Sequence, residues 1–317
     1  MLRAYVAKRL IATIPVLLGV SIVIFLLMHL APGDVTTVLL GPQATEQDRM
    51  VLRHALGLDL PLPIQYGRWL VRIVVGDFGT SIATSLPVLQ LILPRFVNTI
   101  ILTVSSLFLA IAAGYGLGFL CALRARSLLD RIVMTVTLVL GSTPPFWLGL
   151  VLVLFFALHL HWLPVSGMID MAGDGGIIDT LYHLVLPAVT TALAPAAIIA
   201  RMVRSSILES LARPHVRVAR AKGLRHRDLL RRHVILDALP TITTITGLQL
   251  GYLLGGALFS EVVFAWPGLG SLLYNSITAR DMPVVQAATL LIALSFVLVN
   301  ILVDFMNVLI DPRLRER

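Results

Sequence analysis

The chain has 317 residues, of which 57% are hydrophobic and only 13% are charged, and its mean hydropathy is +0.91. Soluble domains carry about a quarter charged residues, so this composition excludes a water-soluble globular protein. The formal net charge is +8, but the basic residues lie between apolar runs and not on one soluble face, which argues against nucleic-acid binding. We therefore expect an all-α integral membrane protein.

Apolar runs long enough to cross the hydrocarbon core need about 20 residues at ~1.5 Å per residue, and six such runs occur. Each must be helical, because backbone groups in lipid have no other hydrogen-bond partner. The predicted transmembrane helices cover, approximately, residues 9–30, 97–123, 132–158, 182–203, 241–263 and 285–308. The first run is too long for a signal peptide, so we interpret it as a retained span.

Arginine and lysine in the short segments between the spans predict the orientation. Residues 1–9 and 124–131 carry three each, residues 204–240 carry nine, and the tail carries three. Residues 159–181 carry none, and residues 264–284 carry only Arg280. Both termini are therefore expected in the cytoplasm, with the tail at 309–317.

Residues 31–96, between the first two spans, are too long for a simple connector and are expected to form a small helical segment outside the membrane. Thr45 and Asp48 have the spacing of a capping box, and Gly57 is a natural helix end. A second short helix is expected at about 64–75. We expect this segment to pack against the spans, with docking of an external partner as the alternative.

The predicted spans contain few groups that could perform chemistry. Ionisable residues near the middle of a span mark ion or proton pathways, but His29, Arg201, Glu261 and Asp304 all lie near span ends. There is no Gly-x-x-x-x-Gly-Lys-Ser/Thr loop to hold ATP phosphates, and no convincing cluster of metal ligands. We therefore expect no catalytic residue, no metal site and no cofactor bound by this chain.

Small residues recur at a spacing of four in two of the spans. Gly114 and Gly118 share one face of the second span, and Gly247, Gly251 and Gly255 share one face of the fifth. Such faces allow helix backbones to approach closely. Packing is the simpler interpretation. The sharper hypothesis is that the fifth span lines a pathway, through the residues Gly247, Gln249, Gly251, Tyr252 and Gly255. In the third span, the sequence from Ser142 to Trp147 contains Pro144 and Pro145 and must bend or break the helix.

Residues 204–240 are more basic than orientation alone requires. Pro214 is suited to the first position of a helix, and Gly223 is suited to a left-handed residue after its end. A short basic helix is expected between them, and a second at about 226–236. On chemistry alone, the loop contacts lipid headgroups or sets topology, or it presents a short helix to another protein.

The segment Val216-Arg-Val-Ala-Arg-Ala-Lys-Gly-Leu224, followed by Ala238-Leu-Pro240, resembles the cytoplasmic loop of permease subunits of binding-protein-dependent ABC importers, in the oligopeptide/dipeptide/nickel branch. Further strings resemble that family in the same order along the chain. They are Leu30-Ala-Pro-Gly-Asp34, Leu56-Gly-Leu-Asp59, Gly76-Asp-Phe-Gly79, Ser260-Glu-Val-Val-Phe-Ala-Trp-Pro-Gly-Leu-Gly270, Arg280-Asp281 and Asp311-Pro-Arg313. The general motif begins Glu-Ala-Ala where this chain has Arg217, Val218 and Ala219, so the role of that glutamate does not transfer.

The resemblance implies a five-helix permease core at 97–308 and a coupling helix that inserts into a separate ATP-binding subunit. The interface would be Ala219, Arg220, Ala221, Lys222, Gly223 and Leu224, with Ala219 and Leu224 packed against the partner. It also implies ATP and magnesium in partner subunits, a second related permease chain, an external substrate-binding protein and a location in the bacterial inner membrane.

Several alternatives stay open at this point. Within the importer family the solute is expected to be a peptide, with nickel or another small solute as the alternative. A secondary transporter driven by an ion gradient would need a charge near the middle of a span. A membrane anchor or assembly protein would not copurify with an ATPase subunit.

Overall fold

The structure is a computed structural model that describes residues 2–30, 40, 44–170 and 175–310, and all structural statements below concern these residues. Within them the regular structure is helical, apart from one isolated bridge between Thr80 and Pro87. The motif at 31–34 and the tail at 311–317 lie outside the described residues. The described chain divides into two compact units, residues 12–95 with 272–294, and residues 96–271 with the N- and C-terminal segments.

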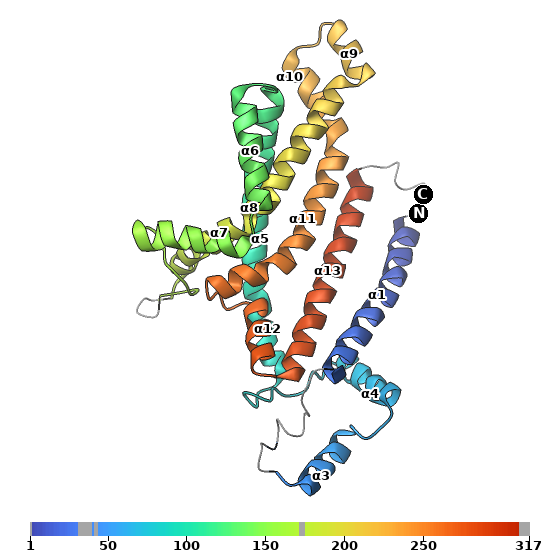
Figure 1. The fold of residues 1–317 in the computed structure, drawn as a ribbon. Helices are drawn as coiled ribbons and strands as arrows, with labels where there is room; N and C mark the ends of the chain where they lie inside the picture. Colours follow the sequence, from blue (N-terminus) through green and yellow to red (C-terminus); the bar gives the residue numbers. More distant parts are fainter. Residues whose placement is uncertain (1, 31–39, 41–43, 171–174, 311–317) are drawn as a thin grey trace. The chain divides into compact units, whose positions relative to one another are not determined.

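The larger unit is built around α8 (Ile177–Ala212), the helix whose apolar part is the most buried of the candidate spans. The helices α6 (Leu128–Ser142) and α11 (Ile235–Val263) pack along it. The end of α13 (Met282–Ile310) also belongs to this unit, as does most of α5 (Val88–Leu123). Figure 1 shows α6, α8 and α11 running side by side toward the tip that carries α9 and α10.

Close approach of α5 to α8 explains the first pair of small residues. A Cβ atom at Gly114 would lie 2.7 Å from Ile199 Cγ2, and one at Gly118 would lie 2.6 Å from the carbonyl oxygen of Ala200. These positions therefore require glycine because of helix packing.

The predicted break in the third span is confirmed. α6 ends at Ser142, Thr143 is extended, and α7 (Pro145–Leu152) starts at a bend of 108° and continues into the π-helical turn η1 (Val153–His159). Pro144 and Pro145 remove two backbone donors at this point, so the helix cannot continue straight.

Four helical stretches are long and apolar enough to cross a membrane, or five if the bent pair is one span. They contain the predicted spans at 97–123, 182–203 and 241–263 and most of the one at 285–308, and the bent pair covers 132–158. The predicted first span lies in α1 (Leu2–Leu30), whose described apolar part, Ile11–Leu27, is shorter than the others. The structure thus supports a multi-pass membrane protein, and the sixth span stays a prediction.

In the smaller unit, both short helices predicted between the first two spans form. α3 (Glu46–Leu56) begins with the predicted capping box of Thr45 and Asp48 and ends at Gly57, whose φ is +69°. α4 (Leu62–Val74) begins two residues before the predicted start. Its Tyr66 hydroxyl lies 2.8 Å from Ser21 Oγ of α1, and Trp69 donates to Gln286 Oε1 at 3.0 Å. Packing of α4 against the neighbouring helices is confirmed within this unit.

Candidate functional site: the basic loop

The basic loop, residues 204–240, consists of the end of α8, α9 (Pro214–Ala221), α10 (His226–Leu229), the π-helical turn η2 (Leu230–Val234) and the first turn of α11. Pro214 occupies the predicted first position of α9, where its missing N–H has no intrahelical partner to lose. Gly223 has φ +81°, as predicted for a left-handed residue. Among the described residues, no atom lies within 4 Å of a Cβ built there, so the backbone angle alone favours glycine.

One face of α9 is anchored in the core of its own chain. Val216 is 1% exposed and Ala219 is 7% exposed, and both belong to a buried cluster with Leu229, Val234 and Ile207. The spacing of three between Val216 and Ala219 places both side chains on the same side of the helix. This apolar contact fixes the orientation of α9 relative to α8 and α11.

The predicted roles of Ala219 and Leu224 need correction because of this packing. Ala219 is buried, and Leu224 is partly buried against the same cluster. In this structure the Ala219 side chain stabilises the loop from inside, and the Leu224 side chain does so in part. The sequence prediction failed here because a motif shared with a family does not show which face of a short helix points inward.

The opposite face of α9 is open. Arg217, Arg220, Ala221, Lys222 and Gly223 are all exposed. Val218, which the sequence prediction omitted, is 55% exposed in the middle of this basic surface. The signal that could have found it is the inward spacing of Val216 and Ala219, which turns position 218 outward. The arrangement offers a small apolar contact surrounded by cations.

Side-chain hydrogen bonds link the end of α8 to the first turn of α11, close to α9. Ser210 Oγ donates to Asp237 Oδ2 at 2.8 Å, and Arg213 Nη1 donates to Asp237 Oδ1 at 2.7 Å. Asp237 lies in the first turn of α11, whereas Ser210 and Arg213 lie at the end of α8. These contacts therefore link the two long helices directly below α9.

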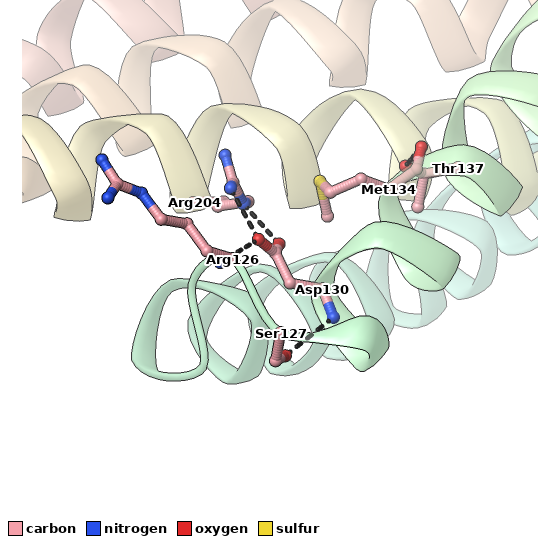
Figure 2. A network of polar contacts seen from close by, with 6 residues as sticks. All are labelled: Arg126, Ser127, Asp130, Met134, Thr137 and Arg204. Carbon is pink, nitrogen blue, oxygen red and sulfur yellow. Dashed lines mark hydrogen bonds and ion pairs between the residues drawn. The ribbon is translucent and has the colours of Figure 1, made fainter.

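A second ion pair joins α8 to the start of α6 (Figure 2). Arg204 donates from Nε to Asp130 Oδ1 at 2.6 Å and from Nη2 to Asp130 Oδ2 at 2.7 Å. The backbone N–H of Arg126 also donates to Asp130 Oδ2, at 2.9 Å. Such a bidentate ion pair fixes both side chains in one geometry. It therefore holds α6 and α8 together at the start of the basic loop.

The predicted second basic helix at about 226–236 is not a separate element. α10, η2 and α11 run on as one helical stretch from His226 to Val263. The π-helical turn at Leu230–Val234 places Leu230 and Val234 in the buried cluster. The helix continues because no proline or glycine interrupts residues 226–239.

The predicted pathway residues on α11 divide between two environments. A Cβ at Gly247 would lie 2.2 Å from Val303 Cγ1, and one at Gly251 would lie 2.9 Å from Phe296 Cε2. Both glycines therefore serve close packing against α13. At Gly255 no described atom lies within 4 Å of the added Cβ, and the neighbouring Tyr252 is 47% exposed. The Oε1 atom of Gln249 is buried without a hydrogen-bond partner among the described residues. Their role in a pathway stays a prediction.

The sequence string at 260–270 contains a carboxylate that the sequence analysis did not assign. Glu261 is fully buried and accepts hydrogen bonds from the N–H groups of Gly270 at 2.6 Å and Ser271 at 3.0 Å. Thr99 Oγ1 donates to Glu261 Oε1 at 2.6 Å. Glu261 thus satisfies the unpaired donors at the start of α12 (Leu269–Thr278). A Cβ at Gly268 would lie 2.1 Å from its carboxyl carbon, which explains that glycine.

Asp281 has the same function in the smaller unit. It is 3% exposed and accepts hydrogen bonds from the Ser81 hydroxyl and from the N–H of Ile82 at 3.1 Å. The segment after α4 is thereby fixed to the start of α13. Two of the family-like strings, around Glu261 and Asp281, are therefore structural signatures.

No group of three or more potential metal ligands occurs among the described residues. His183 pairs with Asp179, with Nδ1 3.1 Å from Oδ1.

Comparisons with known proteins cover nearly the whole chain. Residues 114–316 match the family "Binding-protein-dependent transport system inner membrane component", and residues 1–103 match its N-terminal family. The chain is 40% identical to a probable peptide ABC transporter permease of Sinorhizobium fredii, over 98% of this chain and 99% of the relative. It is 39% identical to the glutathione transport system permease GsiC of Escherichia coli K12, over 99% of each chain.

Among solved structures, the chain resembles an inward-facing form of the MetNI methionine ABC transporter. The TM-score is 0.55 at 20% identity, covering 71% of this chain and 98% of the other. This likeness shows a shared fold. Together with the apolar helices described above, the matches establish that the chain is a multi-pass inner-membrane permease and belongs to the family of binding-protein-dependent transport system inner membrane components.

Proposed function

We propose that this chain forms half of the translocation pathway of an ATP-driven peptide importer. Family membership supports ATP-binding subunits and a substrate-binding protein as partners. The names of the relatives, a probable peptide permease and a glutathione permease, support a short peptide as the solute. The second permease chain is part of this proposal, because six spans form one half of the path. ATP and magnesium are then bound by the partner subunits, and this chain carries no catalytic group.

The proposed topology has six spans with both termini in the cytoplasm. α1 is the first span, and the bent pair α6 and α7 is the third. The orientation rests on the nine basic residues of the basic loop and on the positive-inside rule. It places the basic loop in the cytoplasm and α3 and α4 outside. The external segment at 31–96, the core at 97–308 and the tail at 309–317 are then the parts of the permease.

The coupling proposal rests on one observation, which is that α9 has one buried face and one exposed face. Its inner face is buried in the chain's own core through Val216 and Ala219, while Val218, Arg220 and Ala221 are exposed. A rigid, outward-facing contact surrounded by cations is suited to a groove in another subunit. We place Arg220, Ala221, Lys222 and Gly223 at that interface and add Val218 to it.

Transmission of movement follows from the contacts of the basic loop. The groove of the ATP-binding subunit pushes α9, the Asp237 contacts carry the push into α8 and α11, and the Asp130–Arg204 pair carries it into α6. The packed helices then move as one body between inward- and outward-open states. Gln249, Tyr252 and Gly255 on α11 are the residues that we place nearest to the pathway.

Uptake by proteoliposomes tests the proposal. The vesicles contain this chain, its second permease and its ATP-binding subunits, with the binding protein and a labelled dipeptide or glutathione outside. Uptake that requires both ATP and the binding protein is the expected result. Uptake that follows an ion gradient without ATP would overturn it in favour of a secondary transporter. Uptake of Ni²⁺ but of neither peptide would move the assignment to a metal importer.

A further inference from the structure

The external helix α4 has an exposed apolar strip that the proposed function does not use. Ile64, Val71 and Val74 are 47%, 64% and 78% exposed. Positions 64, 71 and 74 are seven and ten residues apart, so they share one side of the helix at 3.6 residues per turn. Beside this strip lie Arg68 and Arg72, one turn apart and both exposed.

The opposite side of α4 is held by protein. Tyr66 and Trp69 form an aromatic cluster with Phe25 of α1, with ring centroids 5.4 Å and 5.7 Å from that of Phe25. Tyr66 also contacts Ser21, and Trp69 donates to Gln286 of α13. The apolar strip of Ile64, Val71 and Val74 is therefore not needed to pack α4 against its own chain.

These contacts also determine the depth of α4. Ser21 and Phe25 lie nine and five residues before the end of α1 at Leu30, and Gln286 lies four residues after the start of α13 at Met282. At ~1.5 Å per residue, these contact residues lie about 6 to 14 Å inside the ends of the two helices. Helices that lie in a membrane interface are immersed to about 5–10 Å.

We propose that α4 is an interfacial helix that contacts phospholipid of the outer leaflet. Ile64, Val71 and Val74 face the acyl chains, and Arg68 reaches the phosphate groups, while Arg72 is paired with Asp77. Arginine stems can cover apolar surface while the guanidinium stays at the polar boundary, and tyrosine and tryptophan are enriched at this level of the bilayer. The inference rests on the proposed role of α1 as a span and on the external position of α4.

Spin labels measure the depth directly. Single cysteines replace Val71, Val74 or Arg68 in a Cys121→Ala background, because Cys121 is the one native cysteine. The complete importer is reconstituted into phosphatidylcholine vesicles with a minor share of phosphatidylglycerol. Collision rates with oxygen, which concentrates in the acyl region, and with a water-soluble nickel chelate are then compared.

Labels at V71C and V74C should collide at least several-fold more with oxygen than with the chelate, whereas R68C should favour the chelate. Chelate-dominated collisions at V71C and V74C would show a water-facing surface and overturn the proposal. Protection of both positions from both agents would show that another protein chain covers the strip, which would equally overturn it. Peptide uptake measured on the same vesicles separates this result from the fate of the proposed function.

Discussion

The two ends of the larger unit are stabilised by opposite means. At the basic loop, apolar side chains such as Val216 and Val234 are buried, and the basic side chains of Arg217 and Arg220 on α9 are exposed. At the start of α12, a fully buried carboxylate, Glu261, holds the backbone and Trp266 is completely buried beside it. In our proposal, α9 keeps its basic side chains exposed because they contact a partner subunit, whereas the turn at Glu261 supports the fold and uses its charge internally. The predictions below test this difference.

Glu261→Ala should cause the largest loss of stability. It leaves the N–H groups of Gly270 and Ser271 and the hydroxyl of Thr99 without this acceptor. We expect the free energy of unfolding to fall by about 3 kcal/mol, the upper range for hydrogen bonds to a charged group. Thermal unfolding of the purified permease measures it. Glu261→Gln, which keeps one acceptor oxygen, should lose less, and equal losses in the two variants would contradict the capping role.

Asp130→Ala should have the next largest effect. It leaves Arg204, which is 27% exposed, without its carboxylate at the base of the basic loop. We expect a loss of about 2 kcal/mol, less than for a fully buried pair, together with a lower ratio of peptide transported to ATP hydrolysed. The control is Glu46→Ala, because the Glu46 carboxylate that pairs with Arg49 is 77% exposed. An unchanged transport ratio in Asp130→Ala would remove this pair from the proposed transmission.

The variants Gly223→Val and Gly76→Val compare the basic loop with the segment at 31–96. Gly223 and Gly76 have φ of +81° and +85°, and neither has a described atom within 4 Å of an added Cβ. The backbone strain of a β-branched residue, about 1–2 kcal/mol, should therefore be the same at both positions. Gly223→Val should abolish uptake while membrane insertion stays normal, and Gly76→Val should retain uptake. Normal uptake in Gly223→Val would contradict the coupling proposal.

Asp77→Asn should have the smallest effect. The Arg72 side chain, and then the N–H of Gly79, hold the pKa of Asp77 below its ordinary value. A carboxyl group whose pKa is lowered in the folded state stabilises that state at pH values above the ordinary carboxyl pKa. This stabilisation is lost as the pH falls through the folded pKa. Both groups are exposed, so unfolding at neutral pH should be unchanged by the substitution. A clear shift in the melting temperature at pH 7 would show that the turn after α4 is more tightly constrained.

Local rules in the sequence predicted much of the fold. The capping box at Thr45, the left-handed Gly57 and Gly223, the start of α9 at Pro214 and the break at Pro144 all appear in the structure. Each depends on residues within one or two turns of the chain, so local chemistry determines it. The apolar runs likewise predicted the long helices, because only composition and length are needed.

Features that depend on distant residues were not predicted. The inward orientation of Ala219 depends on its contact with residues of α8 and α11, and the role of Glu261 depends on Thr99, more than 160 positions away. For Gly247 and Gly251 the sequence left helix packing and a pathway open, because it does not show that Val303 and Phe296 pack against them. Spacing along a helix shows which residues share a face, but not what that face contacts.

Cysteine cross-linking to the partner tests the central claim most directly. Ala219→Cys and Ala221→Cys lie two positions apart on α9, one buried and one exposed, and each is made in the Cys121→Ala background. The assembled importer is treated with a short bifunctional thiol reagent, with single cysteines placed along the groove of the ATP-binding subunit. The account predicts cross-links from Ala221→Cys and none from Ala219→Cys. Cross-links from Ala219→Cys alone, or from neither variant, would contradict it.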